Sequence, residues 1–234
     1  CSSKIVFVGT TNDTSEIFVC DFDGANVKKV TANNYLSLEP DWANNGKTIV
    51  YTYYTKFYTD VVAIDLLTKK TKTLANYPGM NSSAAICPNN KYMAMILSRD
   101  RKVELYIKDL QGKGVLRVTE GESVESSPCW SPDGSKVCFV SGESGRPKLF
   151  IYDLRTKSQK KVSLVGGSEA VSPSWSGNNE LVYSAKFGRE YTLAVTDLSG
   201  KSKPQNVFRF GKIPGGNWEC PSWAPDNRHV VCSR

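Results

Sequence analysis

The sequence predicts an all-β fold built from repeated four-stranded units, and three observations support this prediction. An Asp recurs every 44 residues, a mostly Trp position recurs every 44 to 48 residues, and a turn rich in Asn, Asp, Pro or Gly follows each Trp position. The repeated Asp residues are Asp21, Asp65, Asp109, Asp153 and Asp197. The residues at the Trp position are Trp42, Ile86, Trp130, Trp175 and Trp223. Four antiparallel strands in each unit of about 40–45 residues is the pattern of a β-propeller.

Each unit is predicted to hold four strands, which we name A to D in chain order. Strand A ends at the Trp position, and strand B follows the turn, as in KVCFVS at 136–141. Strand C ends near the repeated Asp, as in LFIYDL at 149–154, and strand D completes the unit. Apolar residues two and four places before each Asp are typical of a strand with one buried face. In the predicted A–B hairpin, Trp130 lies opposite Val137 and packs between neighbouring blades.

The repeat covers residues 1–234, which we predict to form a single propeller domain. Strands A, C and D are each counted five times, but strand B is counted six times, from 4–9 to 229–234. Two arrangements fit this count: a five-bladed ring closed by pairing the chain ends, or a six-bladed ring with an incomplete blade. The predicted units are about 1–31, 32–75, 76–119, 120–163 and 164–210, with a closing hairpin at 211–234.

The residue inventory offers little for catalysis or metal binding. His229 is the only histidine, no G-x-S-x-G motif occurs, and the seven cysteines show no C-x-x-C spacing. No run of about 18 apolar residues predicts a transmembrane helix. We therefore predict a protein that is not an enzyme, with no catalytic residues, no metal and no cofactor.

The repeated phrase resembles the propeller repeat of the TolB family, which belongs to the Tol–Pal system of Gram-negative bacteria. The stretch with the strongest resemblance is SPCWSPDGSKVCFVSGESGRPKLFIYDL at 127–154. The resemblance implies a periplasmic protein whose propeller binds the peptidoglycan-associated lipoprotein Pal. Family members also carry a small α/β domain before a six-bladed propeller, whereas this sequence shows the propeller repeat alone. Because peptidase and lyase propellers share the repeat, the alternative is the propeller of a serine peptidase or other hydrolase separated from its catalytic domain.

The connections between strands divide into two rims of different composition. We name the rim of A–B and C–D turns the turn face, and the rim of B–C and D–A loops the loop face. Most of the net charge of +7 is predicted on the turn face, at Lys28, Lys29, Lys47, Lys69, Lys70, Lys72, Lys91, Lys113, Lys157, Lys160, Lys161, Lys201, Lys203 and Arg228. The loop face mixes aromatic, Arg and Glu residues, which is the composition of a protein-binding surface. Nucleic-acid binding is not predicted, because the aromatic residues lie on the rim opposite the lysines.

We predict that a protein partner docks on the loop face over the central channel. The residues expected at the mouth are Glu39, Glu125, Glu169, Trp218 and Glu219, and those expected around it are Phe57, Arg99, Arg101 and Arg189. With the resemblance, this gives a non-enzymatic, periplasmic, monomeric protein that binds a Pal-like lipoprotein and associates peripherally with the cell envelope.

The hairpin register also predicts which cysteines face each other. Cys129 falls opposite Cys138 on the same face, so this pair alone has the placement for a disulfide. In the last hairpin, Cys220 is predicted opposite Ser233 and Cys232 opposite Pro221, which sends the two sulfurs to opposite faces. We therefore expect at most one disulfide in the chain.

Overall fold

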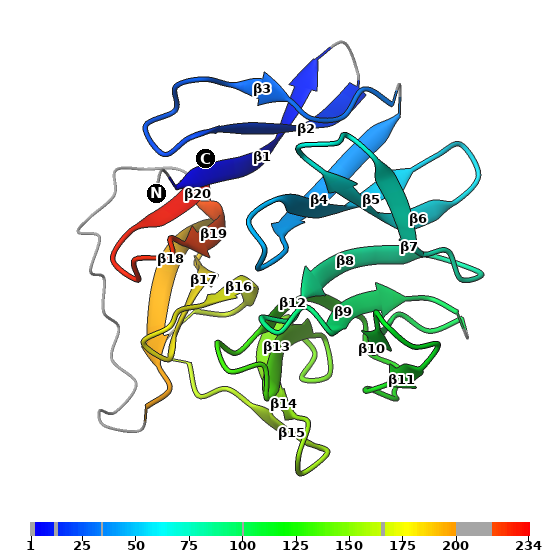
Figure 1. The fold of residues 1–234 in the computed structure, drawn as a ribbon. Helices are drawn as coiled ribbons and strands as arrows, with labels where there is room; N and C mark the ends of the chain where they lie inside the picture. Colours follow the sequence, from blue (N-terminus) through cyan, green and yellow to red (C-terminus); the bar gives the residue numbers. More distant parts are fainter. Residues whose placement is uncertain (1–2, 12–13, 34, 100, 165–166, 200–216) are drawn as a thin grey trace. The chain divides into compact units, whose positions relative to one another are not determined.

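A computed structural model describes residues 3–11, 14–33, 35–99, 101–164, 167–199 and 217–234. Every regular element in these ranges is a β-strand, as predicted, and the strands pair into antiparallel sheets (Figure 1). No helix of the described part could cross a membrane. The chain divides into two compact units, Cys1–Gly121 and Glu122–Arg234, which we describe one at a time.

The first unit holds three sheets in which strands that are consecutive in the sequence pair with each other (Figure 1). The first sheet contains β1 (Lys4–Thr11), β2 (Thr14–Asp21) and β3 (Lys28–Lys29). The second sheet contains β4 (Leu36–Trp42), β5 (Thr48–Tyr54), β6 (Thr59–Asp65) and β7 (Thr71–Ala75). The third sheet contains β8 (Asn81–Ile86), β9 (Tyr92–Leu97), β10 (Glu104–Asp109) and β11 (Val115–Arg117).

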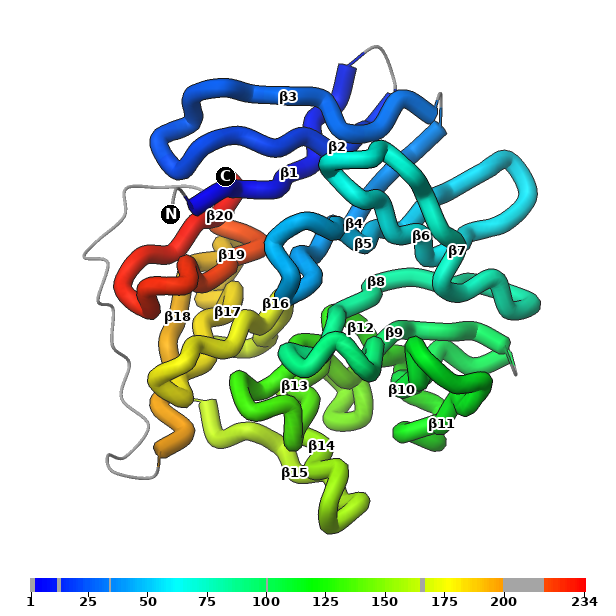
Figure 2. The backbone as a smooth tube through the Cα atoms, in the orientation of Figure 1, coloured from blue at the N-terminus to red at the C-terminus, as the bar shows by residue number. Residues whose placement is uncertain are grey.

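The second unit repeats this arrangement, and its backbone runs from green to red in Figure 2. The fourth sheet contains β12 (Glu125–Trp130), β13 (Lys136–Ser141), β14 (Lys148–Asp153) and β15 (Ser158–Lys161). The fifth sheet contains β16 (Ala170–Trp175), β17 (Glu180–Phe187) and β18 (Glu190–Asp197). The last hairpin contains β19 (Glu219–Trp223) and β20 (Val230–Ser233). The fifth predicted D strand falls in 200–216, outside the described residues.

Every A strand has a β-bulge at one repeat position. In each A–B pair the register shifts three to four residues before the turn, for example between Leu38 and Asp41 in β4. The residues at this position have positive φ values between 48° and 52°, and they are Glu39, Ser83, Ser127, Ser172 and Cys220. A side chain with a Cβ atom in this region costs about 1–2 kcal/mol, so the surrounding hydrogen bonds must hold the bulge in place.

The bulge decides which predicted residue pairs are correct. Trp130 pairs with Val137, and Cys129 pairs with Cys138, as predicted, because both pairs lie between the bulge and the turn. The prediction that Cys220 pairs with Ser233 is wrong, since Glu219 takes that place. Cys220 is itself the bulged residue, and its extra length shifts the register beyond it.

The apolar core lies between neighbouring sheets within each unit. In the first unit, one cluster joins the second and third sheets around Val50, Met93 and Met95, and another packs Trp42 against residues of the first and second sheets. In the second unit, Trp175 packs against a cluster that contains Cys138 and Leu181. The Trp position therefore contributes to packing between sheets, which is where the alternation placed it.

The repeated Asp residues end strand C, and Asp65, Asp109 and Asp153 cap the turn that follows. One carboxylate oxygen of Asp65 accepts hydrogen bonds from the backbone nitrogens of Leu67 (2.9 Å) and Thr68 (2.7 Å). Asp109 and Asp153 make the same pair of bonds in their own turns. These bonds favour the charged carboxylate and lower the pKa of all three residues. The column is structural, as its position after strand C indicated.

Candidate functional site

A buried carboxylate ties the end of strand D to strand C in the first sheet. The side chain of Glu16 in β2 is buried and accepts hydrogen bonds from the Thr31 hydroxyl (2.5 Å) and the Asn33 backbone nitrogen (2.9 Å). The same Thr31 hydroxyl accepts a bond from the backbone nitrogen of Ile17 (2.9 Å). The Lys29 ammonium lies 3.5 Å from the carboxylate. We call this arrangement a carboxylate clamp, because it fixes the start of the D–A loop.

The third sheet contains a second carboxylate clamp, 88 residues further along the chain. Glu104 is buried and accepts hydrogen bonds from the Thr119 hydroxyl and the Gly121 backbone nitrogen (2.9 Å). The Thr119 hydroxyl accepts a bond from the backbone nitrogen of Leu105, and Arg117 donates to the carboxylate at 3.0 Å. The bond to Glu104 raises the pKa of the guanidinium of Arg117.

The second sheet has no carboxylate clamp, and a groove opens there instead. Asp60 and Ala75 occupy the positions of the clamp Glu and Thr. A hollow of about 770 Å³ lies between residues 55–60 and residues 76–80. Its lining combines aromatic, polar and proline residues, with Asp60 as the acid among them. Burial raises the pKa of the Asp60 carboxyl. We call this hollow the aromatic groove.

One wall of the aromatic groove is the B–C turn between β5 and β6. The Thr55 hydroxyl accepts hydrogen bonds from the backbone nitrogens of Phe57 (3.2 Å) and Tyr58 (3.1 Å), and the Thr55 backbone nitrogen donates to Tyr58 (2.9 Å). These bonds fix the turn while Phe57 stays 84% exposed and Tyr58 55% exposed. The sequence therefore holds two large aromatic rings in solvent on a constrained turn.

The other wall is the D–A loop before β8, and Asn81 holds it. The buried Asn81 amide donates to the backbone oxygens of Tyr77 (2.7 Å) and Thr59 (2.9 Å), and its oxygen accepts from the Tyr77 nitrogen (2.8 Å). Gly79 has a φ of 90°, and a Cβ atom there would meet the Ser98 hydroxyl at 2.6 Å. The wall is thus tied to both neighbouring strands and needs glycine at its closest approach.

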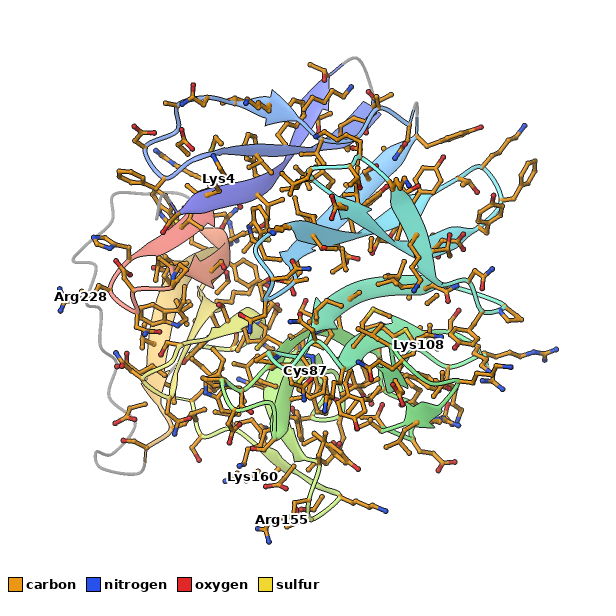
Figure 3. The ribbon with its side chains drawn as sticks, in the orientation of Figure 1. Lys4, Cys87, Lys108, Arg155, Lys160 and Arg228 are labelled. Atoms are coloured by element: carbon orange, nitrogen blue, oxygen red, sulfur yellow. The ribbon has the colours of Figure 1, made fainter. Side chains whose placement is uncertain are left out.

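Three cations lie over the aromatic rings of the groove. The Lys108 ammonium donates to the Tyr77 hydroxyl (2.8 Å) and lies 5.1 Å from the ring centre, while Arg99 lies 5.9 Å from the same ring. Lys108 extends from β10 and is labelled in Figure 3. Lys56 lies 5.6 Å from the Phe57 ring. The predicted residues Phe57 and Arg99 therefore belong to one local site.

Glu39 and Arg101, the other predicted residues of the first unit, lie outside the lining of the groove. Glu39 is the bulged residue of β4, and its carboxylate accepts hydrogen bonds from the Thr52 hydroxyl (2.7 Å) and from both the backbone nitrogen (2.8 Å) and hydroxyl (2.7 Å) of Ser83. It links the bulges of the second and third sheets. Arg101 is exposed in the β9–β10 loop with a φ of 65°.

Glu169 forms a polar cluster in the second unit with residues of β17 and β18. Its carboxylate accepts from the Lys186 ammonium (3.0 Å) and the Tyr191 hydroxyl (2.5 Å). These bonds lower the pKa of Glu169, and the bond to Glu169 raises the pKa of Tyr191 to about 12. Lys186 also lies 5.5 Å from the Tyr191 ring.

Trp218 and Glu219 stand next to this cluster, at the start of the last hairpin. The Trp218 backbone nitrogen donates to Tyr191 (3.1 Å), and the Arg234 guanidinium lies 5.6 Å from the Trp218 ring. Glu219 is exposed at the first position of β19, and Arg189 is exposed in the β17–β18 turn. The second unit thus brings Glu169 and Trp218 together through Tyr191.

Glu125 differs from the other predicted residues because it is buried. Its side chain is 3% exposed, and one carboxylate oxygen accepts hydrogen bonds from the Ser123 (2.6 Å) and Ser141 (3.1 Å) hydroxyls. The buried Glu125 carboxylate therefore links the D–A loop to β13 and is not exposed for contact with a partner.

The comparisons with known proteins agree with the repeat. The family described as "TolB beta propeller domain" matches residues 1–234. The chain belongs to the TolB β-propeller family. The predicted resemblance and the predicted fold of four-stranded propeller blades are therefore confirmed, and the match does not favour a hydrolase propeller.

The chain is also similar to individual TolB proteins in sequence and in fold. The chain is 30% identical to a "Protein TolB homolog" of Chlorobium luteolum over 66% of its length, and 26% identical to the "Tol-Pal system protein TolB" of Francisella tularensis over 96%. It spans 35% and 64% of these two relatives. The crystal structure of TolB from Acinetobacter baumannii superposes with a TM-score of 0.83 at 22% identity, over 97% of this chain and 57% of that one. At this identity the superposition supports the fold alone.

The lysines predicted on the turn face are exposed wherever the structure describes them, and Lys201 and Lys203 lie outside the described residues. In the second unit, Arg155 and Lys160 extend into solvent from the β14–β15 hairpin (Figure 3). His229 lies in the last A–B turn, where its Nδ1 is 2.6 Å from the Asp226 carboxylate. Within the described ranges, no group of three or more His, Cys, Asp or Glu side chains could hold a metal ion.

Sequence reasoning missed Tyr77, Lys108 and Lys186 as members of these two candidate sites. Tyr77 lies in the D–A loop before β8, and Lys108 lies on β10 of the same sheet. The two residues therefore meet although they are 31 residues apart in the sequence. Lys186 lies near the end of β17 and pairs with Tyr191 of β18, which no motif in the sequence indicated. The Pro-Gly dipeptide after Tyr77 was the available signal, because it predicts a turn that would present the ring.

Proposed function

We propose that this chain is a non-enzymatic, protein-binding propeller of a Tol–Pal-type envelope system, that it acts in the periplasm, and that it binds a Pal-like lipoprotein. The observation that carries the proposal is the family match over residues 1–234, together with a relative named as a Tol–Pal system protein that aligns with 96% of the chain.

The binding surface in this proposal is the loop face. In the first unit this face presents Phe57, Tyr58 and Arg99, and in the second it presents Arg189 and Glu219. Exposed aromatic and Arg side chains are the residue types that most often dominate binding energy at protein interfaces. The turn face offers mainly lysine, which is depleted at interfaces, and so supports the proposal less.

Capture of purified Pal by the immobilised chain tests the proposal directly. We expect saturable binding with a dissociation constant below roughly tens of micromolar, and no binding at that concentration would contradict the proposed function. Arg189→Glu should weaken binding about fivefold, as for an interface residue that contributes about 1 kcal/mol. The control Lys69→Glu, on the turn face, should bind like the unmodified chain. If Lys69→Glu had the larger effect, the turn face would be the binding surface.

A further inference from the structure

The aromatic groove exposes large apolar side chains to solvent. Phe57 is 84% exposed although the Thr55 hydroxyl holds its turn in one conformation. Pro78 and Met80 continue the apolar lining on the opposite wall. Contiguous exposed apolar surface in a groove marks a binding site more often than scattered surface residues do.

The walls of the groove are pre-formed, which lowers the entropic cost of binding. Asn81 fixes the D–A loop through bonds to Tyr77 and Thr59, and the Met80 backbone nitrogen donates to the Ser98 hydroxyl (2.7 Å). A rigid site loses little conformational freedom when a ligand binds. The hollow is also open and about 770 Å³, which suits an extended segment better than an enclosed small molecule.

The charges around the groove select the ligand. Arg99 and Lys108 lie over the Tyr77 ring, and Lys56 lies over the Phe57 ring. Asp60 is the acid in the lining, so cations outnumber acids around the rings. A ligand with carboxylates beside a flat ring would meet the cations with its charges and the aromatic residues with its ring.

We propose that the aromatic groove binds an extended acidic peptide segment that carries an aromatic or proline residue. This inference rests on the proposed function, because it names the chemistry of the partner segment that would reach the first-unit part of the loop face. The acidic residues pair with Arg99 and Lys56, and the ring lies between Phe57 and Tyr77.

Two fluorescein-labelled peptides of reversed charge test the proposal, Ac-DEWPDE and Ac-KRWPKR, with affinity read by fluorescence anisotropy. The acidic peptide should bind at least tenfold more tightly than the basic one at low salt. Phe57→Ala and Arg99→Glu should each weaken its binding about fivefold or more. Equal binding of the two peptides, or no binding of either, would overturn the proposal.

Phe22→Ala provides a matched control, because Phe22 is also a highly exposed phenylalanine, at 70%, but follows Asp21 at the end of strand C, on the turn face. Its affinity for the acidic peptide should stay within about twofold, and an equal loss in Phe22→Ala and Phe57→Ala would contradict a specific groove. Thermal unfolding of each variant shows that it folds.

Pal capture is measured in parallel: if Pal binds but the acidic peptide does not, the groove assignment fails and the proposed function stands. If the peptide binds but Pal does not, the proposed function fails instead.

Discussion

The first and second sheets differ at the repeat position that holds Glu16 in one and Asp60 in the other. In the first sheet, Glu16 is buried and ties Thr31 and the D–A loop to strand C. In the second sheet, Asp60 and Ala75 stand at the same positions, and the aromatic groove opens beside them. Asp is one methylene shorter than Glu, and Ala has no hydroxyl to donate. Two small changes thus accompany the difference between the clamped D–A loop of the first sheet and the aromatic groove of the second.

The third sheet shares the clamp of the first, whereas the fourth and fifth sheets have Lys148 and Thr192 in place of the clamp Glu. Glu104, Arg117 and Thr119 lie 88 residues after Glu16, Lys29 and Thr31, and they make the same contacts. The clamp therefore belongs to the first and third sheets, and the second sheet, which lies between them in the sequence, has the aromatic groove in its place.

The strongest test of this comparison removes a clamp. Glu104→Ala leaves the Thr119 hydroxyl, the Gly121 nitrogen and Arg117 without their buried partner. We expect the free energy of unfolding to fall by about 3 kcal/mol, as for one partner removed from a buried ionic network. Urea unfolding measures the change. The neighbouring, exposed Glu120→Ala should change stability by less than about 0.5 kcal/mol, and similar losses in the two variants would show that the clamp stabilises little.

A second test concerns Asp41, an acid of the second sheet that has no clamp. Burial raises its pKa to about 6, although backbone nitrogens, among them that of Ile86 (3.4 Å), donate hydrogen bonds to its carboxylate. Because the folded pKa lies above the ordinary value, the folded state binds the proton more tightly, and stability falls as the pH rises from about 4 to about 6. Asp41→Asn should remove this dependence and stabilise the protein by about 2 kcal/mol at pH 7.

Urea unfolding of both proteins at pH 4 and pH 7 measures this difference. The gap between variant and unmodified chain should grow with pH, which separates Asp41 from the turn-capping Asp residues that titrate in both proteins. A gap that is the same at both pH values would mean that Asp41 is not held in an unfavourable environment.

A third test rebuilds the missing clamp in the second sheet. The double variant Asp60→Glu with Ala75→Thr supplies the carboxylate and hydroxyl that the first and third sheets have. We expect a gain of about 1 kcal/mol in stability, the usual net value of one added hydrogen bond, together with weaker binding of the acidic peptide. Asp60→Glu alone is the control and should show neither effect in full. Unchanged peptide affinity in the double variant would separate the groove from the absence of the clamp.

The smallest expected effect concerns the cysteines. Cys129 and Cys138 are paired and are free thiols in the structure, and burial first, then the bond to Cys129, raises the pKa of Cys138. Mild oxidation of the folded protein should join this pair alone, with little change in stability. Thiol counting after denaturation should then give five of the seven thiols. Three or fewer would contradict the register of the hairpins.

Much of the fold could be predicted because the repeat carries its own register. The 44-residue Asp column and the Trp position placed the strands that the structure describes, and Trp130 opposite Val137 followed from the turn alone. The bulges could not be predicted in the same way. A bulge adds one residue without any change in hydrophobic alternation on the turn side, so it became visible only where pairs beyond it were wrong, as at Cys220.

The candidate site was less predictable than the fold, because its contacts cross between strands. Phe57 and Arg99 were expected on the loop face, yet Tyr77, which brings Arg99 and Lys108 together, was not. Glu125 was expected in a D–A loop at the mouth of the channel, but it is buried and accepts hydrogen bonds from the Ser123 and Ser141 hydroxyls. Composition distinguishes the turn face from the loop face, whereas the burial of a residue depends on its individual neighbours.

The bulge column has a consequence for which substitutions the chain tolerates. Val and Ile are favoured elsewhere in β-strands, but their branched side chains clash with a backbone at a φ near 50°. At Glu39, Ser83, Ser127, Ser172 and Cys220, a saturation library selected for folding should therefore accept Gly, Asn and Asp and reject the branched residues. These five sites would form a mutational fingerprint that runs against ordinary strand preference, once in every repeat.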